Sequence, residues 1–411
     1  MRLFRIAAVS AFTLAVSAGA ASAQTGTGVD EGGPDPATVR MRMGPLWMNP
    51  RLELKNLGVD TNVFNEPDDQ NPKSDFTFTL TPRITMWLRM GRSWLQADVA
   101  EDLVYFQEYT DQRSANEHYG LKWRLPLNRL AFSIAPTYSS TNDRPGFEID
   151  ERVHHTDWGG TAAIEVRAFP KTSIGMSATY ANITYDPNAS YDGSMLALEL
   201  DRTETSAAFT VGHQLTPLTK LGLSVGQEHD RFPHSPLRDT ESTQAAGSVT
   251  FDPHALVRGS ASFGYRNFRP VDPTLEGFKG FTAHGDLSYT LLGATRFGVQ
   301  FSRDVDYSYD VNQPYYLQSA ITGSVDQQVF GPFDAVARAG TAKLAYQDRS
   351  GVAVAVSNRV DYNNTYGGGI GYHFSGGLRL GFNIDYYHRI TDVTQRRYAG
   401  LRYGTSATYD F

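Results

Sequence analysis

The stretch Arg397–Phe411 (RYAGLRYGTSATYDF) alternates between apolar and polar side chains over most of its length. Apolar or aromatic residues occupy alternate positions, among them Ala399, Tyr403 and Tyr409, and the positions between them are mostly small or polar. A period of two places the two sets on opposite faces of one β-strand. We therefore expect this strand to be the final member of a closed sheet.

The same alternation recurs through most of the chain. It is clearest in Asp75–Met90, where apolar residues alternate with threonine and arginine before a tight turn at Gly91. Short turns and longer polar loops follow each other, and the runs between them number about 18. The weakly patterned segment Gln347–Asn358 could be an extra strand or a folded loop, so roughly 16 to 20 strands are compatible with the pattern.

The first residues have the features of a secretory leader. Arg2 and Arg5 precede a short apolar run, and Ala21-Ser22-Ala23 supplies small residues for cleavage. We expect residues 1–23 to be a signal peptide, residues 24–50 a periplasmic lead-in, and residues 51–411 one domain. The chain has no cysteine and a formal net charge of −7, so it has no thiolate chemistry and is not a strongly basic nucleic-acid binder.

The position of aromatic residues favours a membrane barrel over a soluble sandwich. One group lies toward the longer loops and a second toward the short turns, as in the two aromatic girdles of membrane barrels. The first comprises Tyr138, Tyr180, Tyr265, Tyr307, Tyr346 and Tyr386, and the second Trp87, Trp123, Phe169, Phe251, Phe330 and Phe374. The prediction is an all-β protein: a single transmembrane antiparallel up-and-down β-barrel of about 18 strands, with short periplasmic turns and longer extracellular loops.

Two resemblances make this expectation more specific. The ending Tyr409-x-Phe411 resembles the signal that the bacterial outer-membrane assembly machinery reads. The segments 57–64 (LGVDTNVF), 259–265 (GSASFGY) and 295–299 (TRFGV) resemble the hairpins of a family of β-barrel porins found in exopolysaccharide gene clusters. That resemblance implies a barrel in the outer membrane of a Gram-negative bacterium that takes part in polysaccharide export or surface assembly. It implies no catalytic residue.

With the apolar face turned outward, basic residues from several strands are expected to face the lumen near the short turns. Such a ring would concentrate anions at the periplasmic mouth and could admit an acidic polymer. The alternative is that these side chains have no role in transport and simply pair with nearby acids or contact solvent. The residues are Arg89, Lys122, Arg124, Arg167, Arg258, Arg296 and Arg379.

No motif in the sequence indicates an enzyme, a cofactor site or a metal site. His154 and His155 are adjacent and so point to opposite faces of a strand. Acidic residues of the outer loops, such as Glu148 and Asp150, could bind Ca²⁺, but they lack a spaced ligand pattern and are interpreted as solvated charge.

The leading functional prediction is an outer-membrane pore for exopolysaccharide export. Its expected partners are outer-membrane lipid and lipopolysaccharide, the barrel assembly machinery, polysaccharide chains and a periplasmic export partner, with no nucleic acid. The alternatives are a general diffusion porin and a plugged structural or adhesive barrel.

Overall fold

A computed structural model describes residues 33–411 of the chain. The predicted signal peptide, residues 1–23, lies outside the described residues. The described part forms an antiparallel barrel that closes where the first long strand pairs with the last, with Arg51 opposite Asp410. The predicted all-β, 18-strand barrel is therefore confirmed.

The barrel wall is built by consecutive strands, each paired with the next. The first nine are β2 (Leu46–Asp60), β3 (Asp75–Met90), β4 (Ser93–Phe106), β5 (Ser114–Pro126), β6 (Leu130–Asp143), β7 (Val153–Phe169), β8 (Thr172–Tyr185), β11 (Arg202–Thr216) and β12 (Thr219–Arg231). The other nine are β13 (Thr240–Phe251), β14 (Val257–Pro270), β15 (Phe278–Leu291), β16 (Thr295–Tyr307), β17 (Tyr315–Phe330), β18 (Phe333–Gln347), β19 (Val360–His373), β20 (Leu378–Ile390) and β21 (Tyr398–Asp410).

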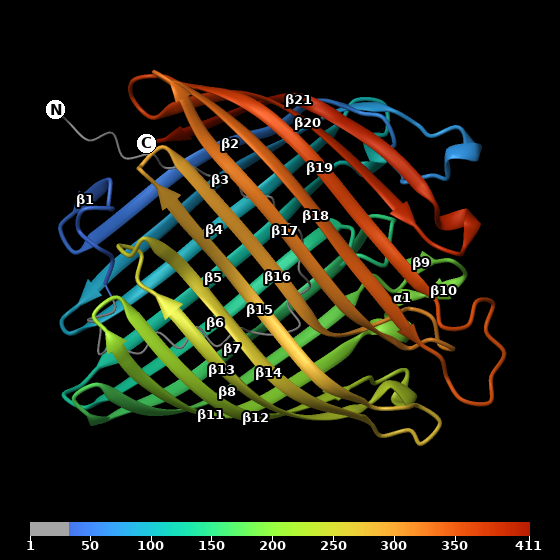
Figure 1. The fold of residues 1–411 in the computed structure, drawn as a ribbon, viewed down its shortest axis with the longest axis horizontal. Helices are drawn as coiled ribbons and strands as arrows, with labels where there is room; N and C mark the ends of the chain where they lie inside the picture. The colour runs from blue at the N-terminus through green and yellow to red at the C-terminus, as the bar shows by residue number, and fades with distance from the viewer. Residues whose placement is uncertain (1–32) are drawn as a thin grey trace.

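The two ends of the barrel differ. Short turns connect the strands at the end where the chain terminates, and the longer loops gather at the opposite end (Figure 1). The smaller elements are β1 (Met41–Met43), which pairs with β2 at the short-turn end, and the hairpin β9 (Ser190–Tyr191) with β10 (Ser194–Met195). Helix α1 (Leu196–Leu200) and the 3-10 turns η1 (Asp68–Gln70), η2 (Thr110–Gln112), η3 (Pro236–Arg238) and η4 (Thr394–Arg396) lie in the long loops. No helix in the described part of the chain is long and apolar enough to span a membrane.

The alternation seen in the sequence separates two faces of the wall. Exposed apolar residues such as Phe263 and Ile370, each 63% exposed, occupy the outer face. Inward positions carry polar and charged side chains that interact with one another on the lumen side of the wall. One example is the ion pair between Arg338 on β18 and Asp385 on β20. Tight turns rely on backbone conformations that glycine adopts without strain, such as Gly91 with φ +62° between β3 and β4.

Several details of the sequence-based interpretation need correction. Residues 348–359 form a loop between β18 and β19 rather than an extra strand, and β2 begins at Leu46, inside the predicted lead-in 24–50. Tyr307 and Tyr346 are not in the outer girdle, because Tyr346 is buried and Tyr307 half-buried among charged groups inside the outer end. Trp87 faces the lumen: it shares a face with Thr85, whose hydroxyl donates to Asp98.

The C-terminal aromatic pair keeps its predicted role in assembly as a testable expectation. The rings of Tyr409 and Phe411 meet edge to face with centroids 4.6 Å apart, and Phe411 is 54% exposed. Deleting Phe411 removes one backbone hydrogen bond, from its N–H to the carbonyl of Pro50, and leaves the β2–β21 pairing intact. We expect the deletion to slow membrane insertion severalfold in cells while barely changing the unfolding midpoint of refolded protein. Normal levels of heat-modifiable barrel in cells would contradict an assembly signal.

Candidate transport path

One outer loop crosses the lumen. The crossing loop, residues 144–152, joins β6 to β7, but its contacts lie about half the circumference away in the strand order. Phe147 packs against the buried cluster of Tyr316, Ala342, Leu344 and Tyr346 on β17 and β18, and its carbonyl accepts from Asn363 Nδ2 on β19 at 2.7 Å. The loop therefore spans the barrel interior and narrows it.

Buried arginines fix the far side of the crossing loop. Arg389, on β20, donates to the carbonyl of Glu148 at 3.0 Å and to Asp150 Oδ2 at 2.6 Å. Arg396, beyond the end of β20, donates to the same Glu148 carbonyl and lies 3.5 Å from Asp150 Oδ2. Asp361 accepts from Arg389 at 2.7 Å, and both side chains are fully buried. Charges this deeply buried persist because each is paired.

The Glu148 carboxylate forms a separate anchor. It is 2% exposed and accepts hydrogen bonds from the hydroxyl of Ser308 at 2.6 Å and from the backbone N–H of Tyr309 at 3.1 Å. Burial raises the pKa of this carboxyl above its ordinary value of 4.5, although the nearby charge of Arg396 opposes the shift. The interpretation of Glu148 and Asp150 as solvated loop charge is therefore wrong, since both are buried and bonded.

A pH prediction follows from this anchor. A carboxyl with a raised pKa in the folded state favours folding at low pH, and that contribution is lost as pH rises through the folded pKa. Glu148→Gln removes the charge and keeps one acceptor oxygen for the Tyr309 N–H, while its amide NH2 can donate to the Ser308 hydroxyl. We expect the variant to gain on the order of 1 kcal/mol over wild type as pH rises from about 4 to 8, measured as a difference in urea unfolding free energy. A constant difference across that range would exclude a raised pKa at Glu148.

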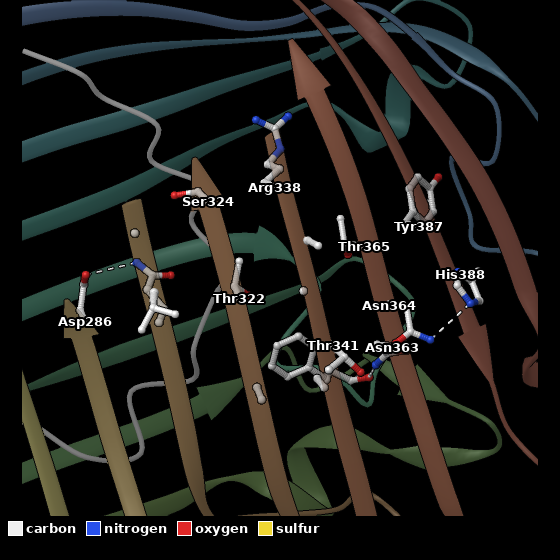
Figure 2. Close-up of a pocket in the computed structure, with 18 of the residues that line it drawn as sticks. Asp286, Thr322, Ser324, Arg338, Thr341, Asn363, Asn364, Thr365, Tyr387 and His388 are labelled. Atoms are coloured by element: carbon white, nitrogen blue, oxygen red, sulfur yellow. Dashed lines mark hydrogen bonds between the residues drawn. The ribbon is translucent and has the colours of Figure 1, made fainter. Parts of the chain in front are cut away.

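Below the crossing loop, a cavity of about 550 Å³ follows the wall formed by β15 to β20. Its lining includes hydroxyl, amide and charged groups. Figure 2 shows Ser324, Thr322 and Arg338 on neighbouring strands, with Thr365 and Tyr387 further along the wall. Asp286, on β15, accepts a hydrogen bond from Gln300 on β16 at 3.2 Å. The cavity therefore offers a polar surface to a solute.

Glycines on β19 allow two ion pairs to lie flat on this wall. Arg338 binds Asp385 with its Nε at 2.8 Å and its Nη2 at 2.6 Å, so that the pair bridges β18 and β20 over Gly367. Arg379 and Asp334 form a second two-point pair over Gly371. A Cβ at either glycine would overlap these side chains. The absence of a side chain at Gly367 and at Gly371 thus allows the two ion pairs to lie against the wall.

The seven predicted basic residues all occupy lumen-facing positions close to short turns, because residues directly opposite each other in a sheet share a face. The structure does not bring them into contact with one another; most meet other partners instead. Arg379 pairs with Asp334 at 2.5 Å, Arg124 lies 3.8 Å from Glu165, and Arg296 is opposite Asp326. The remaining four are Arg89 opposite Trp94, Lys122 opposite Gln96, Arg167 opposite Ser173 and Arg258 opposite Ser288.

The sequence reasoning missed two parts of this path. It did not identify the acids Asp326 and Asp334, which lie on strands next to the basic residues and offset their charge. It also did not identify the crossing loop, although Arg144–Arg152 combines Pro145 and Gly146 with three acidic residues and an apolar Phe-x-Ile pair. Apolar residues inside an otherwise polar loop are the signal that could have indicated a loop folded into the lumen.

Comparison with solved structures gives distant similarities to outer-membrane porins. The crystal structure of OccAB4 from Acinetobacter baumannii aligns with a TM-score of 0.46 and 9% identity, covering 92% of this chain and 100% of that one. A BenF-like porin from Pseudomonas fluorescens Pf-5 aligns with a TM-score of 0.49 and 11% identity, covering 90% and 99%. A comparison with curated proteins found no match.

The family comparison covers nearly all of the described residues. The matching model is that of the family described as Putative beta-barrel porin 2, and the match includes the wall strands and the crossing loop. A closed barrel of this kind places the protein in the outer membrane of a Gram-negative bacterium. With its match over residues 35–411, the chain belongs to the Putative beta-barrel porin 2 family.

Proposed function

We propose that the protein is a passive diffusion channel for small polar solutes, narrowed by the crossing loop. The observation that carries this proposal is the anchoring of that loop on the opposite wall. Arg389 and Arg396 hold Glu148 and Asp150 with buried hydrogen bonds, and freeing one partner would leave charge uncompensated in the interior. A loop held in this way limits the size of what can pass.

The wall chemistry favours polar solutes of low net charge. Arg338 and Arg379 are each neutralised by an aspartate, and Ser324, Thr322 and Thr365 add neutral groups that can exchange hydrogen bonds with a solute. A volume of about 550 Å³ lies within the range of sites for single small molecules, which is roughly 300–1,000 Å³. Sugars of one or two rings, and zwitterionic solutes, fit both the size and the chemistry.

Planar-bilayer recordings test the proposal. We expect wild type to give a small steady conductance, and a variant lacking residues 146–150 to give a conductance several times larger, because the constriction is removed. A matched control lacks residues 351–355 of the outer loop 348–359, which does not cross the lumen, and should conduct like wild type. Equal conductance of all three proteins would show that the crossing loop does not limit flow.

Exopolysaccharide export is a second candidate function. It is supported by the lumen-facing basic residues near the short turns, which include Arg89, Lys122 and Arg258. Passage of a polymer would require the crossing loop to leave its anchors. An acidic oligosaccharide added on the short-turn side separates the candidates: a long-lived block of wild-type current favours export, and an unaltered current favours diffusion of small solutes.

A further inference from the structure

The outward faces of β16 and β18 carry two cations that have no acidic partner among residues 33–411. Arg303 on β16 is turned outward, because its neighbour Asp304 faces inward and pairs with Arg266. Lys343 on β18 is turned outward, because its neighbour Leu344 is fully buried under the crossing loop. Both side chains are exposed. Cations on this surface need an explanation, since the outward face of a barrel contacts lipid.

Arg303 and Lys343 lie in one row across the sheet. Ser319 on β17 is directly opposite Arg303 on one side and Lys343 on the other. With about 4.8 Å between neighbouring strands, the two Cα atoms lie roughly 10 Å apart. The next row toward the short turns is apolar at Phe301 and Ile321 and polar from Thr341 onward, where the side chains of Asn364 and His388 are hydrogen-bonded at 3.2 Å. Lys343 therefore borders the polar part of that row, and Arg303 borders its apolar part.

Two hydrogen bonds fix the orientation of the Arg303 guanidinium. Its Nη1 donates to Ser319 Oγ at 2.8 Å and its Nε to the carbonyl of Phe281 at 3.2 Å. No described residue accepts a hydrogen bond from its Nη2, so the N–H donors of that nitrogen remain available. The Lys343 ammonium lies 5.9 Å from the centre of the Tyr362 ring, which fixes its position without neutralising it.

The position of Arg303 and Lys343 along the barrel axis indicates which anion they can contact. Toward the short turns, outward positions on the same strands are apolar, with Phe301 and Phe297 on β16 and Ile321 and Val325 on β17. One further outward row, Val305, Leu317 and Ala345, lies between the pair and the loop ends of these strands, so the pair lies in the loop-side part of the apolar band, where longer loops mark the outer leaflet. The lipid of that leaflet is lipopolysaccharide, whose lipid A carries phosphates on a diglucosamine unit. Arginine and lysine form strong charge-assisted hydrogen bonds with phosphate.

We infer that Arg303 and Lys343 form a binding site for the phosphorylated diglucosamine of lipid A on the outer face of β16 to β18. Arg303 Nη2 and the Lys343 ammonium bind phosphate, while Ser319 orients the guanidinium and Asn364 and His388 face the sugar. The site lies on the outside of the wall, so it does not depend on which solute the lumen carries.

The test measures lipid retention by native mass spectrometry of the folded barrel. Wild type, taken from nanodiscs of phosphatidylcholine with bisphosphorylated lipid A, should retain at least about tenfold more of it than of fully dephosphorylated lipid A. Arg303→Gln combined with Lys343→Gln should abolish this preference. Arg269→Gln is the matched control: Arg269 also lies at the outer end but is already paired with Glu241 at 2.6 Å, so its loss should leave the preference intact.

Two further arms make the outcome unambiguous. A heat-modifiable band confirms that each variant is folded, and inorganic pyrophosphate tests whether free phosphate competes. Weak or no competition by pyrophosphate is expected if the whole headgroup is recognised, while full competition at equal concentration would reduce the site to a free-anion site and overturn the lipid assignment. Equal retention of the two lipids by wild type, or an unchanged preference in the double variant, would likewise overturn it.

Discussion

Arg389→Met is expected to lower the free energy of unfolding by about 3–5 kcal/mol, the cost of removing one partner from a buried ion pair. The Arg389 guanidinium is fully buried and binds Asp150 at 2.6 Å and Asp361 at 2.7 Å, so its loss leaves both carboxylates with fewer partners in the interior. Methionine fills similar space without a charge. Urea titration of the folded barrel in micelles, followed by tryptophan fluorescence, measures the loss.

The same substitution should also release the crossing loop. Arg389 is one of two arginines that hold the Glu148 carbonyl, and it contributes the closer ion pair to Asp150. Conductance should therefore rise and become noisier. The control is Arg231→Met: Arg231 is 46% exposed and lies 3.6 Å from Glu241, so its loss should cost less than about 1 kcal/mol. Similar losses in the two variants would show that Arg389 has no special structural role.

The barrel was predictable because its signal is repeated in most of its strands. A period of two over Asp75–Met90 and again over Arg397–Phe411 admits few other structures, and the tight turns give the register. The aromatic girdle was predicted in part. Tyr138 and Tyr180 are exposed as expected, but Tyr307 and Tyr346 lie close to strand ends, where the outer loops pack over them. Alternation alone does not tell which strand ends are covered.

The transport path was less predictable because it depends on contacts between distant segments. Face assignment from the sequence predicts that Arg296 and Arg379 face the lumen, but only the closed sheet shows Asp326 and Asp334 beside them. The crossing loop was even less predictable from the sequence. Its anchors on β20 and beyond lie more than two hundred residues away in the chain. Nothing in the sequence around Glu148 indicates that its backbone carbonyl accepts a hydrogen bond from Arg389 rather than from water.

The charge selectivity of the short-turn mouth is expected to depend on several arginines together. Arg124, Arg258 and Arg296 lie on three different strands and face the lumen. Because neighbouring charges act through one shared field, we predict that changing all three to serine lowers the anion-to-cation permeability ratio by at least about twofold in low salt. The measurement is the reversal potential across a salt gradient in a planar bilayer.

The structure limits how large this shift can be and suggests its control. Glu165 lies 3.8 Å from Arg124 and Asp326 is opposite Arg296, so part of the positive field is cancelled before any substitution. The shift should almost vanish near 1 M salt, where the screening length is about 3 Å.

Glu165→Gln combined with Asp326→Asn removes the opposing charges and should move the reversal potential the other way. Opposite shifts in the two variants require that both sets of side chains border one open aqueous path. Unchanged selectivity in a folded triple variant would mean that ions do not pass these three side chains. The short-turn mouth would then not determine which solutes enter.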